Sequence, residues 1–209
     1  VDISKLKTGR LPESDWAKIA KQTPRLMSSK INVVIDDSSP LSLLELRSKA
    51  RRMKALQNID MIMVDYLQLM EVSNKGNLDR HLEIAYITRG LKQLSKELDI
   101  PVVALSQLSR KVEERAGKEK RPQLSDLRES GAIEQDADVV IFINRPEVYI
   151  SKDDPKFHEV QGLAEVIVGK QRNGPIGEAK LTFIHNYAMF TNRARDAEPS
   201  YYAPQDAPF

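Results

Sequence analysis

The sequence contains no cysteine, which excludes disulfide bonds and thiolate metal sites. Its three histidines are scattered and form neither an HxxH nor an HExxH pattern, so a zinc enzyme is not expected. No apolar run approaches the roughly 18 residues that span a membrane, and no secretory signal opens the chain. We therefore expect a cytoplasmic protein that has no membrane partner.

An excess of charge of one sign is also lacking. The sequence has 32 lysines and arginines against 30 aspartates and glutamates, a net charge of +2. Composition alone therefore does not predict binding to nucleic acid, and a polyanion would have to bind through local loops. The 209 residues, 41% of them hydrophobic, suffice for one domain with a core. Because the first residue is Val1 and not Met, we expect a fragment or a processed product.

Short apolar runs alternate with amphipathic segments along most of the chain. Continuous apolar runs are typical of strands buried on both sheet faces, whereas apolar residues every three or four positions are typical of helices. Buried strands are predicted at 59–64, 100–105 and 139–143, and helices at 12–29, 43–56, 84–98 and 125–136. This order predicts an α/β fold with a mainly parallel sheet flanked by helices.

Other segments add detail to this prediction. Pro24 is expected to interrupt or kink the first long helix, and the β-branched run 31–35 predicts a further strand. Segments 109–126 and 145–162 are interpreted as loops. Closing strands near 163–170, 178–185 and 188–191, with a turn at 174–177, predict an antiparallel hairpin extension at one edge of the sheet.

Polar residues follow two of the predicted buried strands. Asp65 stands at a carboxyl end, where open α/β sheets bind their ligands, and could hold the water shell of a Mg²⁺ bound to nucleotide phosphates. Gln107 follows the next strand, and its amide could sense a γ-phosphate. The alternatives are an aspartate that caps a turn and an ordinary polar group at a strand end.

Cations are frequent in the predicted loop and the short segment after it. They are Arg110, Lys111, Arg115, Lys118, Lys120, Arg121 and Arg128. These cations could hold phosphates, and Gly131 would let a backbone N–H approach one closely. Acidic residues dilute the charge, however, so a solvated charged loop is the alternative. No aromatic residue is available for stacking here, so binding would be to the nucleic-acid backbone and independent of base sequence.

Two more cations, Lys170 and Arg172, lie two positions apart in a predicted strand beside a tight turn, and so point to the same side. They could reach the phosphate of a neighbouring protein copy. The alternative is an edge strand protected by charge. The sequence has no G-x-x-x-x-G-K-[ST] motif, because Ala164 stands where the first glycine of the nearest candidate should be.

Four strings together resemble one family. MIMVDYLQLM, ALSQLSRKVEER, SDLRESGAIEQDADVV and VGKQRNGPIG, in this order and spacing, resemble the DnaB-type replicative helicases, as does KLKTGRL near the start. The resemblance covers nearly the whole chain and implies a RecA-like motor domain over residues 1–192. Residues 193–209 are expected to be a poorly ordered tail.

The resemblance also implies roles for individual residues. Asp65 matches the family's Mg²⁺-linked aspartate, and Gln107 matches its polar sensor between nucleotide and DNA loops. Lys170 and Arg172 match cations that reach the γ-phosphate held by the adjacent subunit. The positions that match contacts to the backbone of single-stranded DNA are Arg110, Arg128, Glu129 and Gly131.

A whole member of this family is a homohexameric ring that uses ATP and Mg²⁺ to unwind DNA, and it works with primase and a helicase loader. In the family's order the phosphate-binding loop lies before Val1, so we expect no measurable ATP hydrolysis from these residues alone. Two other functions stay open. A RecA-type recombination ATPase shares the core, and a non-enzymatic fragment could serve only as an assembly or loader-binding surface.

Overall fold

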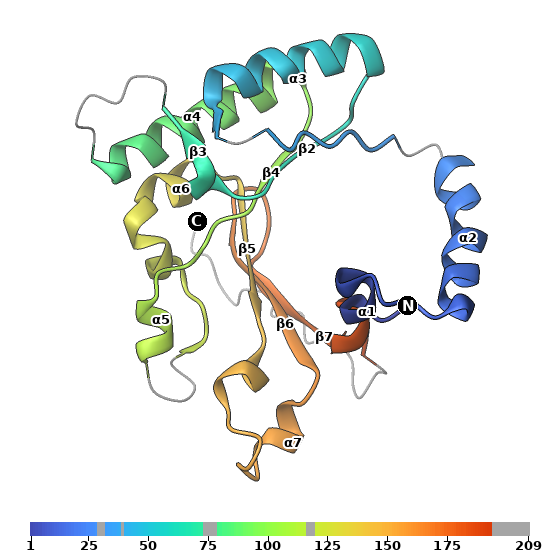
Figure 1. Cartoon of the computed structure of the whole chain (residues 1–209). Helices are drawn as coiled ribbons and strands as arrows, with labels where there is room; N and C mark the ends of the chain where they lie inside the picture. Colours follow the sequence, from blue (N-terminus) through green and yellow to red (C-terminus); the bar gives the residue numbers. More distant parts are fainter. Residues whose placement is uncertain (29–31, 39, 73–78, 116–119, 194–209) are drawn as a thin grey trace. The chain divides into compact units, whose positions relative to one another are not determined.

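The computed structural model describes residues 1–28, 32–38, 40–72, 79–115 and 120–193 (Figure 1). The chain divides into two compact units. The first unit takes in 1–34, 141–168 and 176–209, and the second takes in 35–140 and 169–175. All the residues that the sequence singles out for chemistry belong to the second unit.

The second unit joins short parallel strands to helices. Its elements are β1 (Leu41–Ser42), α3 (Leu43–Gln57), β2 (Ile62–Val64), η1 (Leu67–Leu69), β3 (Met70–Glu71), α4 (Arg80–Leu98), β4 (Val102–Ala104), α5 (Lys111–Glu114), η3 (Leu124–Ser130) and α6 (Gly131–Asp136). Strand β2 pairs in parallel with β4, and β1 pairs in parallel with β3. Helices α3 and α4 run side by side, and α6 contacts α4 (Figure 1).

Local signals in the sequence set the ends of the two long helices. Helix α3 begins at a capping box in which Ser42 and Glu45 satisfy each other's backbone N–H groups. Helices α3 and α4 end at Asn58 and Asp99, both in the left-handed conformation that ends many helices. The predicted helices at 43–56 and 84–98 are therefore confirmed with small changes of boundary.

The core of the second unit lies between these helices and one face of β2 and β4. Ala50, Ile62, Leu94 and Ile100 are buried there, and the partly buried Val64 packs against them. This burial supplies the main favourable term for folding of the unit.

The opposite face of the same two strands is exposed. Met61, Met63, Val103 and Leu105 keep 51%, 69%, 38% and 48% of their surface accessible. The prediction that these strands are buried on both faces is therefore wrong. Side chains alternate across a strand, and in the described part of this unit helices α3 and α4 cover only one side.

The first unit is built around antiparallel strands. Its elements are α1 (Ile3–Thr8), α2 (Glu13–Ser28), η4 (Pro146–Tyr149), α7 (Phe157–Val160), β7 (Gly177–Ile184), η5 (His185–Tyr187) and β8 (Met189–Asn192). Strands β5 (Val139–Asn144) and β6 (Leu163–Gln171) contribute residues to both units. The sheet order is β5-β6-β7-β8, with antiparallel pairing from β6 to β8. The predicted hairpin extension and the α/β class are thus confirmed.

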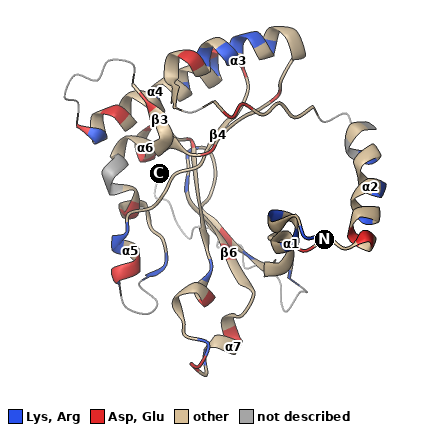
Figure 2. Ribbon diagram, viewed as in Figure 1, with Lys and Arg blue, Asp and Glu red and all other residues tan. Residues whose placement is uncertain are grey.

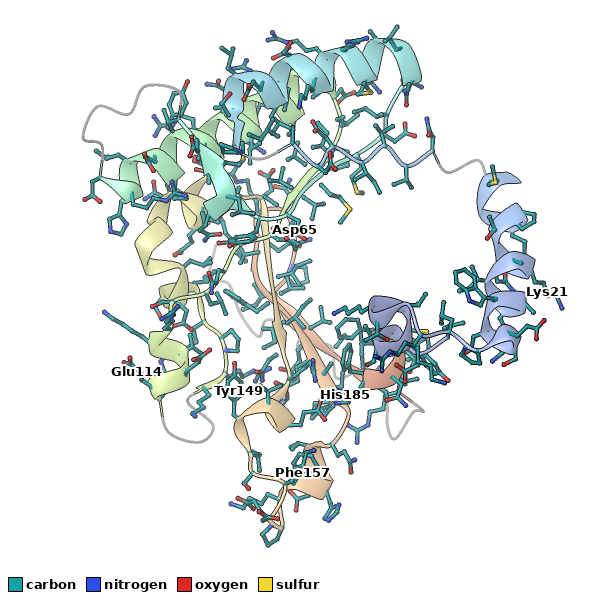
Figure 3. The ribbon with its side chains drawn as sticks, in the orientation of Figure 1. Lys21, Asp65, Glu114, Tyr149, Phe157 and His185 are labelled. Carbon is teal, nitrogen blue, oxygen red and sulfur yellow. The ribbon has the colours of Figure 1, made fainter. Side chains whose placement is uncertain are left out.

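A buried carboxylate fixes the loop after β5 in the first unit. Glu147 accepts hydrogen bonds from the backbone N–H of Gly162 at 2.7 Å and from Arg145 at 3.0 Å. It also lies 2.9 Å from the imidazole of His185 in η5. Burial raises the pKa of Glu147, but these partners together hold it below its usual value. Figure 3 labels His185 of η5 and Tyr149 of η4.

Some predictions differ from the structure. Residues 32–35 form no strand, and the side chains of Val33 and Ile35 are exposed. Helix α2 does not end at Pro24 but continues to Ser28. The loop at 109–126 contains the short helix α5, and most of the predicted tail, 194–209, lies outside the described residues. None of the helices in the described ranges has the length and apolar character needed to span a membrane.

Candidate functional site

The ends of β2 and β4 bring the first two candidate residues to one edge of the second unit. The parallel register places Val64 opposite Ala104, so Asp65 and the segment that contains Gln107 leave the sheet at the same edge. The pairing continues past the strands, because Leu105 donates to the carbonyl of Val64 at 2.9 Å. The Asp65 side chain is exposed at this edge (Figure 3), and the peptide bond that follows it is cis.

Asp65 by itself cannot form a complete metal site. No group of three or more His, Cys, Asp or Glu side chains gathers around a possible metal position within the described ranges. Magnesium, however, typically binds through one or two carboxylates together with water and substrate phosphates. An exposed carboxylate at a strand end fits that role, with nucleotide phosphates supplying the remaining oxygens.

Gln68 connects the segment after Asp65 to the segment that contains Gln107. Its amide nitrogen donates to the hydroxyl of Ser106 at 3.0 Å and to the carbonyl of Gln107 at 3.4 Å. Its amide oxygen accepts from the backbone N–H of Gln107 at 3.3 Å. Arg80, on α4, donates to the backbone carbonyl of Gln68 at 2.9 Å and so holds the backbone of Gln68 in place. A shift of either strand end would therefore displace the other through Gln68.

The side chain of Gln107 is exposed beside an open hollow of about 420 Å³. The hollow is lined by Gln107, Leu108, Ser109, Arg110, Lys111 and Glu114. Arg110 stands at the start of α5, and its side chain is exposed too. The structure therefore brings the predicted sensor and the first predicted DNA-contacting cation to a common surface that is open to a ligand.

Helix α5 carries both signs of charge, as Figure 2 shows. Lys111 lies in the same turn as Glu113 and Glu114, so the positive charge of this segment is partly cancelled. The dilution expected from the sequence is thus present on the folded surface. Any affinity for a polyanion here depends on individual cations such as Arg110 and not on a uniform field.

The segment around α5 is anchored by a buried ion pair. Asp126, with 1% of its side chain exposed, pairs with Arg115, which donates from Nη1 at 3.1 Å. The same carboxylate accepts from the N–H of Gln123 at 2.8 Å, and the Asp126 carbonyl accepts from the N–H of Ser109 at 3.2 Å. Arg115, which the sequence offered as a phosphate ligand, therefore serves to hold the loop.

The last predicted DNA contacts lie where η3 meets α6. The backbone of Arg128 and Glu129 belongs to η3, but their side chains lie outside the described part of the structure. Gly131 opens α6, is exposed, and has helical backbone angles. Among the described residues, and apart from its chain neighbours and its own helix backbone, a Cβ added to Gly131 would meet no atom within 4 Å. The backbone at Gly131 is therefore open to close approach by a ligand.

The two cations at the end of β6, Lys170 in the strand and Arg172 just after it, lie against the end of α6. Lys170 donates from Nζ to the carbonyls of Glu134, Gln135 and Ala137, at 2.8 Å in the last case. Arg172 donates to the Asp138 carboxylate at 3.0 Å and to the Gln135 carbonyl at 3.3 Å. None of these contacts reaches Asp65. Within one copy, Lys170 and Arg172 thus form a group whose hydrogen bonds do not include Asp65 or Gln107.

Three residues that the sequence reasoning missed connect the predicted site residues to the fold: Gln68, Asp126 and Asp138. Gln68 stands only three positions after Asp65, so its place near the strand end was visible in the sequence. Asp126 and Asp138 occur in charged stretches where nothing in one sequence distinguishes a buried or paired carboxylate from a solvated one.

Comparison with known proteins gives a consistent result. A family model described as "DnaB-like helicase C terminal domain" matches residues 1–192. The replicative DNA helicase DnaB of Pasteurella multocida (strain Pm70) is 51% identical over 205 residues, which cover 96% of this chain and 42% of that protein. The replicative DNA helicase DnaB of Geobacillus stearothermophilus is 42% identical, covering 98% of this chain and 43% of that protein. The chain thus spans about two fifths of the length of these curated relatives.

Solved structures agree with these matches. An ATPase domain that is 38% identical superposes with a TM-score of 0.78, covering 93% of this chain and 66% of that one. A DnaB-like replicative helicase, whose structure was described together with its interactions with primase, is 37% identical with a TM-score of 0.76. That match covers 93% of this chain and 45% of the helicase.

Proposed function

Because this chain belongs to the family of DnaB-like helicase C-terminal domains, we propose that it forms the motor of a replicative DNA helicase that hydrolyses ATP to unwind duplex DNA. The observation that carries the proposal is the junction after β2 and β4. There Asp65 and Gln107 follow paired strands, and Gln68 connects the two segments. Such strand ends are where open α/β sheets bind ligands.

The active protein in this proposal is longer than the chain. We propose that it also carries the phosphate-binding segment that the family resemblance implies, and a protein that contains both parts is called the complete helicase below. In it, the exposed Asp65 carboxylate holds the hydrated Mg²⁺ that accompanies ATP. When bound, this Mg²⁺ neutralises charge on the phosphate oxygens. We expect the chain without that segment to lack ATPase activity.

We propose that Lys170 and Arg172 act on the nucleotide of an adjacent copy in a homohexameric ring. They form a group apart from Asp65 within one copy, and 49% of the Arg172 side chain is exposed. A guanidinium supplied by a neighbour stabilises charge that develops during phosphoryl transfer. Each nucleotide would then lie between Asp65 of one copy and Arg172 of the next.

We further propose that Gln107 transmits the state of the nucleotide to single-stranded DNA. Its side chain is exposed beside the hollow that Arg110 also lines, and Gln68 ties its backbone to the segment after Asp65. The DNA backbone would contact Arg110, Arg128, Glu129 and the N–H group of Gly131. Because all these contacts are to phosphate and sugar, the helicase would move along DNA of any sequence.

Primase and a helicase loader are the proteins that we propose as partners of the complete helicase. A solved relative was described together with its interactions with primase, which supports the first of these. We place the protein in the cytoplasm with the DNA.

Substitution of one residue tests the proposed reaction. In the complete helicase, Arg172→Ala should abolish ATP hydrolysis because the charge that forms on the transferred phosphate loses its cation, while nucleotide binding remains. Turnover and equilibrium binding of a fluorescent nucleotide measure the two effects. Arg52→Ala, which removes an exposed arginine of α3 in the same unit, is the matched control and should leave both unchanged. Wild-type hydrolysis or unwinding by Arg172→Ala would exclude the proposed role.

A further inference from the structure

The end of α6 forms a polar cradle for the two cations at the end of β6, Lys170 and Arg172. The cradle consists of the carbonyls of Glu134, Gln135 and Ala137 together with the carboxylate of Asp138. Lys170 contacts only the carbonyls, which a helix end leaves without partners in its own backbone. Arg172 contacts a carbonyl and the carboxylate. The two cations are thus held differently, and only Arg172 depends on Asp138.

Asp138 contacts Arg172 in two ways. Its carboxylate accepts from Nη1 of Arg172 at 3.0 Å, and its backbone carbonyl accepts from the Arg172 N–H at 2.9 Å. The second contact fixes the backbone of Arg172 beside Asp138, so the ion pair forms between positions that are already adjacent. Such an arrangement restricts the rotamers of a long side chain with little additional loss of entropy.

A second cation shares the same carboxylate. Lys92, on α4, donates to the other oxygen of Asp138. The hydrogen bond from Lys92 is the main reason that the pKa of Asp138 lies below its usual value, with smaller contributions from Arg172 and Lys170. The Asp138 carboxylate therefore interacts with three cations, Lys92, Arg172 and Lys170.

The cradle rests on a fixed element. Thr88 of α4 donates from its hydroxyl to Asp136 at the end of α6 at 2.7 Å, and Ile133 of α6 is buried. Two donors of Arg172 are used within the cradle, so its remaining N–H groups are available while half of the side chain is exposed.

From this geometry we propose that Asp138 is a positioning residue for hydrolysis, which holds the Arg172 guanidinium in the orientation that the neighbouring copy's nucleotide requires. This inference rests on the proposed function. A cation that is locked beforehand loses less freedom when it meets the transferred phosphate, and small errors in its placement slow the reaction strongly. Asp138 itself contacts neither nucleotide nor Mg²⁺ in this account.

The test uses Asp138→Asn in the complete helicase. We expect kcat for ATP hydrolysis to fall about 10-fold because Arg172 loses its ionic partner and samples other rotamers. We expect KM for ATP to change by less than about 2-fold, since Asp138 does not contact the nucleotide. Ring assembly, followed by size-exclusion chromatography with light scattering, should remain as in the wild type.

Lys92→Met is the matched control. Both variants remove the ion pair between Lys92 and Asp138, so they should lower the thermal midpoint by similar amounts. Only Asp138→Asn removes the ion pair with Arg172. We therefore expect kcat of Lys92→Met to stay within about 2-fold of the wild-type value. This difference separates orientation of Arg172 from a loss of stability.

Three results would overturn the inference. Wild-type kcat in Asp138→Asn shows that Arg172 needs no orientation, and a higher kcat shows that Asp138 restrains Arg172 from the nucleotide. An equal loss of kcat in Lys92→Met shows a merely structural role. If Arg172→Ala also hydrolyses ATP normally, the proposed function fails as well. If Arg172→Ala is inactive while Asp138→Asn is normal, only the role of Asp138 is excluded.

Discussion

At the scale of single residues, Gly131 shows most clearly how a role in folding can be separated from a role in binding. Its φ of −50° is helical, and a Cβ there would meet no other atom within 4 Å. The folded chain thus makes no demand for glycine at this position. A methyl group at this position would instead obstruct a ligand that approaches the backbone closely.

Gly131→Ala should accordingly separate stability from DNA binding. Alanine restricts the unfolded chain, so the free energy of unfolding should stay unchanged or rise by about 0.5 kcal/mol. In the complete helicase the affinity for single-stranded DNA should fall about 10-fold, because the new methyl group blocks the approach to the N–H. Denaturant unfolding and fluorescence anisotropy measure the two effects.

Gly177→Ala is the control for this prediction, since a Cβ at that position in β7 also meets nothing within 4 Å. It should leave DNA affinity as it is. Equal affinity in the wild type and in Gly131→Ala would show that DNA does not approach the start of α6.

At the scale of structural elements, one buried ion pair holds the loop that carries Arg110 and α5. Asp126 is buried, and its partners Arg115 and Gln123 lie on the same loop. The α5 segment contributes one buried apolar residue, Val112. Its position is therefore fixed mainly by polar contacts around Asp126.

Asp126→Ala should release this loop. The substitution removes the buried contacts of Asp126 with Arg115 and with the Gln123 N–H, so we expect the free energy of unfolding to fall by about 2–3 kcal/mol. Trypsin should then cleave after the cations of this segment faster than in the wild type. Asp153→Ala, at an exposed position, is the control. Unchanged cleavage and unchanged denaturant midpoints would contradict the anchoring role.

Elements whose signals are local could be predicted from the sequence. Apolar periodicity predicts helices at 43–56 and 84–98, which correspond to α3 and to most of α4, and the turn at 174–177 predicts the hairpin of β6 and β7. Segment 32–35 has the composition of a strand but is not part of one, because strand pairing depends on other parts of the chain. Contacts between distant segments also limit what can be predicted of the site. The positions of Asp65 and Gln107 after strands could be predicted from the sequence, but the hydrogen bonds through Gln68 that connect them could not.

At the scale of the whole molecule, the exposed face of β2 and β4 affects how copies of the chain associate. Met61, Met63, Val103 and Leu105 form an apolar surface, and such surfaces promote association. We expect the 209-residue chain to self-associate as its concentration rises. Met61→Thr combined with Met63→Thr should weaken this association several-fold and change the free energy of unfolding by less than about 1 kcal/mol, because both side chains are already exposed.

Sedimentation velocity over a range of concentrations measures this association. Met27→Thr, which changes a methionine that is 83% exposed in the first unit, should have no comparable effect. A chain that remains monomeric at all concentrations would show that this sheet face does not mediate contact between copies.

The central claim for the whole molecule is that two copies share each nucleotide, with Asp65 from one and Arg172 from the next. Mixed rings of two inactive complete helicases, Asp65→Asn and Arg172→Ala, test it most directly. Where an Arg172→Ala copy supplies Asp65 and its Asp65→Asn neighbour supplies Arg172, the site is intact. Random mixing should therefore restore ATP hydrolysis to about a quarter of the wild-type rate if the sites act independently. Mixed rings that hydrolyse no more ATP than either variant alone would contradict the account.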